Sequence, residues 1–179
     1  GGFIGLELAA SARTRAATVT LVEAQPRLLA RGVPEAIAAC VHKRHASEGI
    51  EILCGEGVRQ IEERGSLIRV KTTSGRKLEA ELCVIGIGAV PATALAETAG
   101  LTIDNGIAVD ECLHTSDPNI LAAGDCCSLP LGIYDGRRVR LEAWRSAQEQ
   151  GALAAMNMLG GNLRYESVPW FWSDQYDTT

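Results

Sequence analysis

The sequence predicts an α/β fold in which a parallel sheet is interrupted by an antiparallel excursion. Up to Cys54, short β-branched runs alternate with helix-like stretches. Three strand-like runs with a hairpin connection follow, and the apolar run Glu81–Gly88 has the character of a buried parallel strand. Hydrophobic residues make up 46% of the 179 residues and charged residues 22%, a composition typical of a folded chain.

The chain opens with a glycine-rich turn, Gly-Gly-Phe-Ile-Gly-Leu-Glu. Gly2 and Gly5 have the spacing of the second and third glycines of the dinucleotide motif G-x-G-x-x-G. Gly2 would let the backbone approach a pyrophosphate, and Gly5 would let the helix pack closely on a strand. A helix expected over Phe3–Arg15 would direct its first N–H groups, those of Phe3 and Ile4 included, at the phosphates. The alternative is that these glycines serve tight packing only.

A β-branched run at Ala17–Glu23 is the next expected strand, and it ends in an acid about 20 residues after the turn, as the motif requires. Glu23 would accept hydrogen bonds from ribose hydroxyls and repel a 2′-phosphate, which favours NADH over NADPH. Arg27 and Arg31 would soften that preference by pairing with phosphate. An ordinary solvated strand end is the alternative for Glu23.

A second helix and two kinds of strand are expected next. Pro34–Glu48 reads as a helix with His42 and His45 at its surface or half buried, and Ile50–Cys54 as a short strand. The antiparallel excursion is expected at three runs: Val58–Glu63, Leu67–Thr73 and Leu78–Ile85.

Two glycines lie at the end of the apolar run Glu81–Gly88. Gly86 and Gly88 at its carboxyl end would allow close approach to a bound ligand, or else make only a tight exit turn.

The second half of the chain predicts a short helix over Thr93–Gly100, a strand over Ile107–Asp110 and a buried strand ending at Gly124-Asp125. Ligands of open α/β sheets bind beyond the carboxyl ends of strands, so Asp125 is a candidate acceptor for a polyol. A helix N-cap is its alternative role.

A long helix interrupted by Gly151 is expected over Glu142–Leu159. The aromatic residues in Pro-Trp-Phe-Trp-Ser-Asp-Gln-Tyr, from Pro169 onward, are typical of a domain interface, and less often of a surface that stacks on a cofactor.

Composition and motif spacing argue against several kinds of partner and site. The net charge of -5 argues against a nucleic-acid partner. The six cysteines and three histidines lack zinc spacing, so no metal site is predicted, and buried reduced thiols in a cytoplasmic protein are expected. The vicinal Cys126-Cys127 pair is given no catalytic role. No apolar stretch is long enough to cross a membrane.

Five segments together resemble one family in their order and spacing: G-G-F-I-G-L-E, V-T-L-V-E, V-I-G-I-G-A-V-P, T-S-D-P-N-I-L-A-A-G-D-C and P-W-F-W-S-D-Q-Y. The chain resembles the FAD-dependent pyridine-nucleotide reductases, specifically the ferredoxin–NADH reductases of ring-hydroxylating dioxygenase and haem-thiolate monooxygenase systems. The resemblance implies a Rossmann-like architecture with FAD- and NAD-binding domains. It also implies electron transfer from NADH through FAD to a [2Fe–2S] ferredoxin.

The resemblance also implies roles for individual residues. Glu7 would lie near the nicotinamide carboxamide, Glu142 in the nicotinamide–flavin region and Trp172 near the flavin edge. Asp125 would accept hydrogen bonds from the FAD ribityl or pyrophosphate region. By the same resemblance, Gly86 and Gly88 would line the NAD cleft, and Arg31 would face the adenosine half of the cofactor.

The family's domain plan implies that residues 1–114 form most of an NAD domain, 115–167 a returning segment of the FAD domain, and 168–179 the start of an interface domain. The first glycine of the motif and the strand before it would precede residue 1. The chain is therefore expected to be a fragment, truncated at both ends, which alone folds poorly and holds FAD weakly. Two alternatives remain: a related flavoprotein with a rubredoxin, disulfide or quinone acceptor, and an inactive dinucleotide-binding remnant or sensor.

Overall fold

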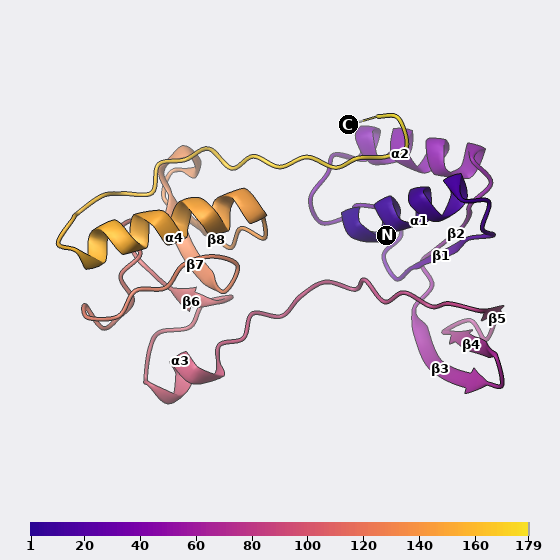
Figure 1. Cartoon of the computed structure of the whole chain (residues 1–179), viewed down its shortest axis with the longest axis horizontal. Helices are drawn as coiled ribbons and strands as arrows, with labels where there is room; N and C mark the ends of the chain where they lie inside the picture. Colours follow the sequence, from indigo (N-terminus) through magenta and orange to yellow (C-terminus); the bar gives the residue numbers. More distant parts are fainter. Residues whose placement is uncertain (179) are drawn as a thin grey trace. The chain divides into compact units, whose positions relative to one another are not determined.

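A computed structural model describes residues 1–178 and divides the chain into two compact units. The first unit comprises Gly1–Gly88 together with the segment that begins at Trp172, and the second comprises Ala89–Phe171. Figure 1 follows the chain through both. The domain boundaries expected from the family plan, at residues 114 and 167, remain a prediction.

The first unit begins with the β-α repeat that the sequence predicts. Helix α1 (Phe3–Thr14) is followed by β1 (Thr20–Glu23), α2 (Glu35–Ser47) and β2 (Glu51–Cys54). Strands β1 and β2 pair in parallel, with Leu21 opposite Ile52. Both strands are shorter at their amino ends than the apolar pattern suggested, whereas both helices lie within the expected ranges.

The core of this unit lies between the two helices and the parallel strands. Leu6 and Ala9 of α1, Leu21 of β1 and Ala38 of α2 are buried in it, and Leu28 packs there from the loop after β1. The outer face of α1 is solvent-exposed and carries two apolar side chains, those of Ile4 and Leu8.

The antiparallel excursion is confirmed as a three-stranded sheet of β3 (Val58–Arg64), β4 (Leu67–Thr72) and β5 (Lys77–Ala80) in sequential order. The turn after β4 contains Gly75, whose φ of 91° is a conformation that favours glycine. This sheet and the parallel pair confirm the predicted fold class.

The strand expected at 81–88 is not observed. Strand β5 ends at Ala80, and no strand is assigned from Glu81 to Gly88. Leu82 is 75% exposed and Ile87 is 84% exposed. An apolar run becomes a buried strand only if a neighbouring strand accepts its backbone hydrogen bonds, and within residues 1–178 the run pairs with none.

The second unit contains a small mixed sheet and one long helix. Its elements are α3 (Ala94–Thr98), β6 (Ile107–Ala108), β7 (Cys127–Leu131), a 3₁₀ turn (Gly132–Tyr134), β8 (Arg137–Val139) and α4 (Trp144–Met158). Strand β7 lies between β6, with which it is parallel, and β8, with which it is antiparallel.

Two expectations for this unit are wrong. The buried strand follows the Gly124-Asp125 pair instead of preceding it, and the residues before the pair make only an isolated bridge between His114 and Leu121. Helix α4 continues through Gly151 without interruption and begins after Glu142, at Trp144. Its tertiary contacts outweigh the modest cost of one exposed glycine in a helix, about 1 kcal/mol.

A buried glutamine of α4 holds the Gly-Asp turn. Gln150 is fully buried, and its Oε1 accepts hydrogen bonds from the Gly124 N–H at 2.8 Å and from Cys127 Sγ at 2.8 Å. Its Nε2 donates to Ser146 Oγ at 3.0 Å. Gln150 therefore satisfies polar groups that would otherwise be buried without partners.

Within the described residues, every helix is too short or too polar to cross a bilayer.

Replacing Gln150 with alanine is expected to lower the free energy of unfolding by about 2–3 kcal/mol, because the buried Gly124 N–H loses its acceptor and a cavity forms. The matched control is Gln148→Ala, since Gln148 is exposed on the same helix, and its effect should stay within about 0.5 kcal/mol. Urea denaturation of the two variants measures both values. Equal effects of the two changes would contradict the assigned role of Gln150.

Candidate functional site

The glycine turn lies at the amino end of α1 and is open to solvent. Gly2 is the N-cap residue, with φ −85° and ψ 178°, and no side chain of the described residues caps the helix there. A Cβ placed on Gly2 would meet no atom within 4 Å. The first N–H groups of a helix have no intrahelical acceptor, so this end of α1 fits an anionic group. Among residues 1–178, a Cβ on Gly5 would likewise meet no atom within 4 Å.

Glu23 lies beside this turn at the carboxyl end of β1. A Cβ on Gly1 would overlap its side chain, so a larger residue at position 1 would require the Glu23 side chain to shift. The Gln25 N–H donates to Glu23 Oε1 at 2.7 Å, and the Gly1 nitrogen lies 3.1 Å from Oε2.

The carboxyl group of Glu23 is ionised at neutral pH. Burial alone would raise its pKa, but the hydrogen bond from the Gln25 N–H and the positive charge of Arg31 act to lower it. The side chain is 17% exposed, so a ligand can reach it.

The loop after β1 brings Arg31 to Gly88. A Cβ on Gly88 would lie 3.0 Å from Arg31 Nη2, and the φ of 101° at Gly88 itself favours glycine. Arg27 has a different role from the one expected. Its guanidinium donates to four carbonyl groups of its own loop, so it holds the loop and is not presented to a phosphate.

Glu7 contacts the carboxyl-terminal segment of the chain. Ser173 Oγ donates to Glu7 Oε1 at 2.6 Å, and the Asp174 N–H donates to the same oxygen at 3.2 Å. In Figure 1 this segment, drawn in yellow, passes α1 and reaches α2. Sequence reasoning missed Ser173, because a serine among turn-forming residues has no distinguishing pattern.

His45 anchors the same segment and is fully buried, contrary to the surface or half-buried position expected for it. Its Nε2 lies 2.8 Å from Gln175 Oε1, and its ring centroid lies 5.1 Å from that of Tyr176. Arg44, the preceding residue on α2, pairs with Asp177 at 2.9 Å. Trp172, just before this anchored stretch, is 52% exposed.

Asp125 and Glu142 belong to the second unit. Asp125 is exposed in the turn before β7, so it does not follow a strand as expected. Glu142 Oε1 pairs with Arg140 Nη1 at 2.6 Å, and the same nitrogen lies 3.4 Å from the Asp125 carbonyl oxygen. Arg140 therefore lies between the two predicted acids.

Of the remaining predicted site residues, two lie in helix α1 and one lies in the exposed run that follows β5. Phe3 and Ile4 form the first turn of α1, with Phe3 packed against the core and Ile4 71% exposed. Gly86 lies in the exposed run before Gly88, where a Cβ would meet nothing within 4 Å.

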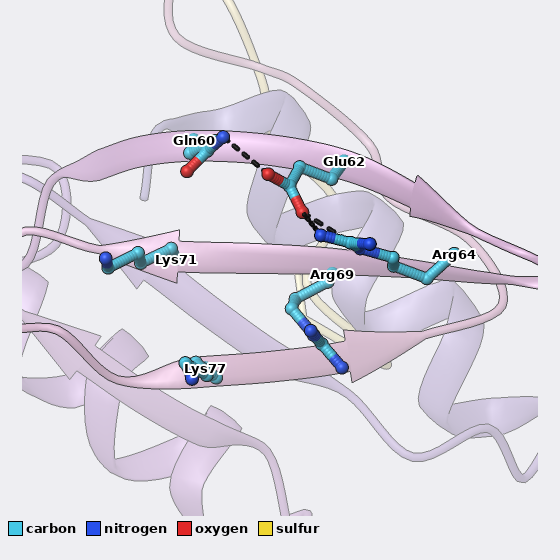
Figure 2. A pocket seen from close by; sticks show the side chains of 6 residues that line it. All are labelled: Gln60, Glu62, Arg64, Arg69, Lys71 and Lys77. Carbon is cyan, nitrogen blue, oxygen red and sulfur yellow. Dashed lines mark hydrogen bonds and ion pairs between the residues drawn. The ribbon is translucent and has the colours of Figure 1, made fainter.

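A hollow on the three-stranded sheet is a polar solvent face and not a candidate site (Figure 2). Two of its arginines are neutralised by acids: Arg64 pairs with Glu62 at 2.7 Å and Arg69 with Glu79 at 2.6 Å. The lining residues occupy alternate positions along the strands and comprise Gln60, Glu62, Arg64, Arg69, Lys71 and Lys77.

The six cysteines are free thiols. Cys127 is fully buried, and burial raises the pKa of its thiol to about 12. It therefore stays protonated at neutral pH and is a poor nucleophile. Cys40 is exposed, so the expectation of buried thiols is wrong at that position.

Comparison with known proteins identifies similar chains. Residues 1–151 match the model of the pyridine nucleotide-disulphide oxidoreductase family. The ferredoxin–NAD(+) reductase component of the anthranilate 1,2-dioxygenase system of Burkholderia cepacia is 41% identical over 177 residues, which are 99% of this chain and 43% of that protein.

Two solved structures agree with this match. The ferredoxin reductase for the CYP199A2 system from Rhodopseudomonas palustris has a TM-score of 0.90 and 39% identity, covering 98% of this chain and 44% of that chain. The putidaredoxin reductase of a covalent complex with putidaredoxin has a TM-score of 0.90 and 38% identity, over 98% and 43% of the two chains. The chain thus spans less than half the length of these relatives.

Stability is expected to fall as the pH is lowered from 7 to about 5. Burial lowers the pKa of His45 below its usual value, an effect that the hydrogen bond to Gln175 only partly opposes. Below pH 6.5 the unfolded chain therefore binds the proton more readily than the folded one. The loss is at most about 1.4 kcal/mol per pH unit. Carboxyl groups with a lowered pKa, such as that of Glu23, affect the pH dependence of stability only at more acidic pH.

Urea denaturation at several pH values measures this slope. His45→Gln should flatten it between pH 7 and 5, whereas His42→Gln, a change at an exposed position of the same helix, should not. An unchanged slope in the His45 variant would contradict the assignment.

Proposed function

Because the chain belongs to the pyridine nucleotide-disulphide oxidoreductase family, we propose that it is part of an NADH-dependent flavoprotein that reduces a [2Fe–2S] ferredoxin. The observation that carries this proposal is the open glycine turn of α1 beside the ionised Glu23. Amide donors suit a pyrophosphate, and a carboxylate acceptor suits ribose hydroxyls. The ferredoxin reductases among its relatives support the choice of acceptor.

On the NADH side, the turn would bind the pyrophosphate through the backbone of four residues, Gly2, Phe3, Ile4 and Gly5. Glu23 would accept from the adenosine ribose, and Arg31 would face the adenosine half. Gly86 and Gly88 would line the cleft. Glu7 would accept a hydrogen bond from the nicotinamide carboxamide.

On the FAD side, Asp125 would accept hydrogen bonds from the ribityl or pyrophosphate region, because its carboxylate is exposed in a turn held rigidly by Gln150. Glu142, held by Arg140, would lie in the nicotinamide–flavin region, and Trp172 near the flavin edge. When bound, FAD supplies the redox chemistry. The protein's part is to position the two cofactors and exclude water.

We place the NAD domain at residues 1–114, the returning FAD segment at 115–167 and the start of the interface domain at 168–179. The free thiols and the family support a cytoplasmic location.

The protein expressed from its complete reading frame is expected to bind FAD, to lose flavin absorbance on anaerobic addition of NADH, and then to reduce an added [2Fe–2S] ferredoxin. Absorbance spectroscopy follows both steps. Gly2→Ala should slow the bleaching at least tenfold, since a Cβ would enter the space assigned to the pyrophosphate, while leaving the melting temperature nearly unchanged. Bleaching without ferredoxin reduction would favour a rubredoxin, disulfide or quinone acceptor. If NADH did not bleach the flavin, the result would favour the interpretation of the chain as an inactive remnant.

Glu23→Gln is expected to reduce the preference for NADH over NADPH about tenfold, because the variant loses the repulsion of a 2′-phosphate and a charged acceptor for the ribose. The ratio of kcat/KM values for the two cofactors measures this change. Glu51→Gln removes the same charge from the amino end of the parallel pair and should leave the ratio unchanged. An unchanged ratio in the Glu23 variant would refute its role.

A further inference from the structure

A chain of hydrogen bonds joins Glu7 to the buried His45 through the carboxyl-terminal segment. Ser173 Oγ lies 2.6 Å from Glu7 Oε1, Gln175 Nε2 lies 2.8 Å from Ser173 Oγ, and His45 Nε2 lies 2.8 Å from Gln175 Oε1. Glu7 and Ser173 are 166 residues apart in the sequence. The four side chains come from α1, α2 and the final segment, all within the first unit.

The direction of every bond in this chain is fixed. Ser173 has a single hydroxyl proton, which it donates to the Glu7 carboxylate. Gln175 must then present its NH₂ group to Ser173 Oγ, so its carbonyl oxygen faces His45 and accepts a proton from Nε2. The opposite tautomer or the flipped amide would leave one bond without a proton. His45 Nδ1 is buried and has no hydrogen-bond partner among residues 1–178, which is consistent with a neutral ring protonated on Nε2.

The carboxyl-terminal segment is also held in place by contacts that do not involve Glu7. Gln175 and Thr178 exchange backbone hydrogen bonds across a tight turn in which Tyr176 has a φ of 62°. That conformation is unfavourable for a tyrosine, and Tyr176 is retained in it by packing beside the His45 ring and under Arg44, whose Cζ lies 5.0 Å from the ring centroid. Ser173 is therefore presented to Glu7 by a preformed turn.

The two hydrogen bonds to Glu7 both end on Oε1. A carboxylate fixed by one oxygen directs the other in a defined direction, and an amide N–H is a suitable donor for it. Holding such a group before the ligand arrives lowers the entropic cost of binding.

We propose that Ser173 and Gln175 are positioning residues of the nucleotide site, which hold the Glu7 carboxylate so that Oε2 accepts a hydrogen bond from the carboxamide of the nicotinamide. This inference rests on the proposed binding of NADH. It adds the carboxyl-terminal segment to the groups that determine the affinity for the nicotinamide half of the cofactor.

Equilibrium binding of two unreactive probes to the complete oxidised protein tests the inference. NAD⁺ carries the carboxamide, whereas ADP-ribose lacks the nicotinamide ring. Ser173→Ala should raise the Kd for NAD⁺ about fivefold to tenfold and leave the Kd for ADP-ribose within twofold, both measured by calorimetry. Ser173→Thr, which keeps the hydroxyl, should restore most of the affinity for NAD⁺. The control Asp177→Asn breaks only the outer ion pair of the segment and should change neither constant.

A double-mutant cycle tests whether Ser173 acts through Glu7. In a Glu7→Gln background, Ser173→Ala should have no further effect on the Kd for NAD⁺. Partial unfolding of a variant reduces the number of binding sites and not the ratio of the two constants, so the ratio remains informative.

Three results would overturn the inference: equal weakening of both probes by Ser173→Ala, no change in either, or additive effects of the two substitutions. A wild-type protein that binds neither probe would instead refute the proposed function itself, and the inference with it.

Discussion

The contact between the glycine turn and the carboxyl end of β1 is the constraint on which the first unit depends. Gly1 accepts a hydrogen bond from the Leu29 N–H at 3.0 Å, and the Glu23 side chain occupies the space that a Cβ at Gly1 would need. The start of α1 is thereby fixed beside a carboxylate, while the space at Gly2 stays open. Amide donors and a charged acceptor, the two groups that a dinucleotide requires, lie at one edge of the parallel pair as a result.

Elements determined by local sequence were predictable, and elements that need a distant partner were not. Helices α1 and α2 and strands β3 and β4 follow from periodicity and turn residues, and they form close to the expected ranges. Strand β5 begins near the expected position but ends at Ala80, five residues before the expected end at Ile85. The apolar run at 81–88 illustrates the limit. Its composition indicates burial, but a strand exists only with a hydrogen-bonded neighbour, and in the described part of the chain it has none.

The same limit applies to the site. The position of Glu23 beside the glycine turn was predictable because their spacing is a local signal, whereas the contacts of Ser173 and Gln175 join residues more than 100 positions apart. For Arg27 the sequence suggested a ligand contact that the structure does not show. A basic residue near a predicted phosphate site suggested a ligand contact, but its guanidinium is used by the carbonyl groups of its own loop. Charge indicates what a side chain can bind, and only the fold decides whether a neighbour already binds it.

Glu7 and Glu23 share one physical arrangement at different ends of the proposed cofactor. Each carboxylate receives a backbone N–H, from Asp174 and Gln25 respectively, and a carboxylate offers about four acceptor positions. Each is thus oriented by the chain and still able to accept further hydrogen bonds. A nicotinamide dinucleotide carries donors of the kind that the proposal assigns to these two acids, ribose hydroxyls at one end and a carboxamide at the other. Oriented acceptors of this kind favour binding and alignment, which is the contribution that a cofactor-dependent oxidoreductase requires of its protein.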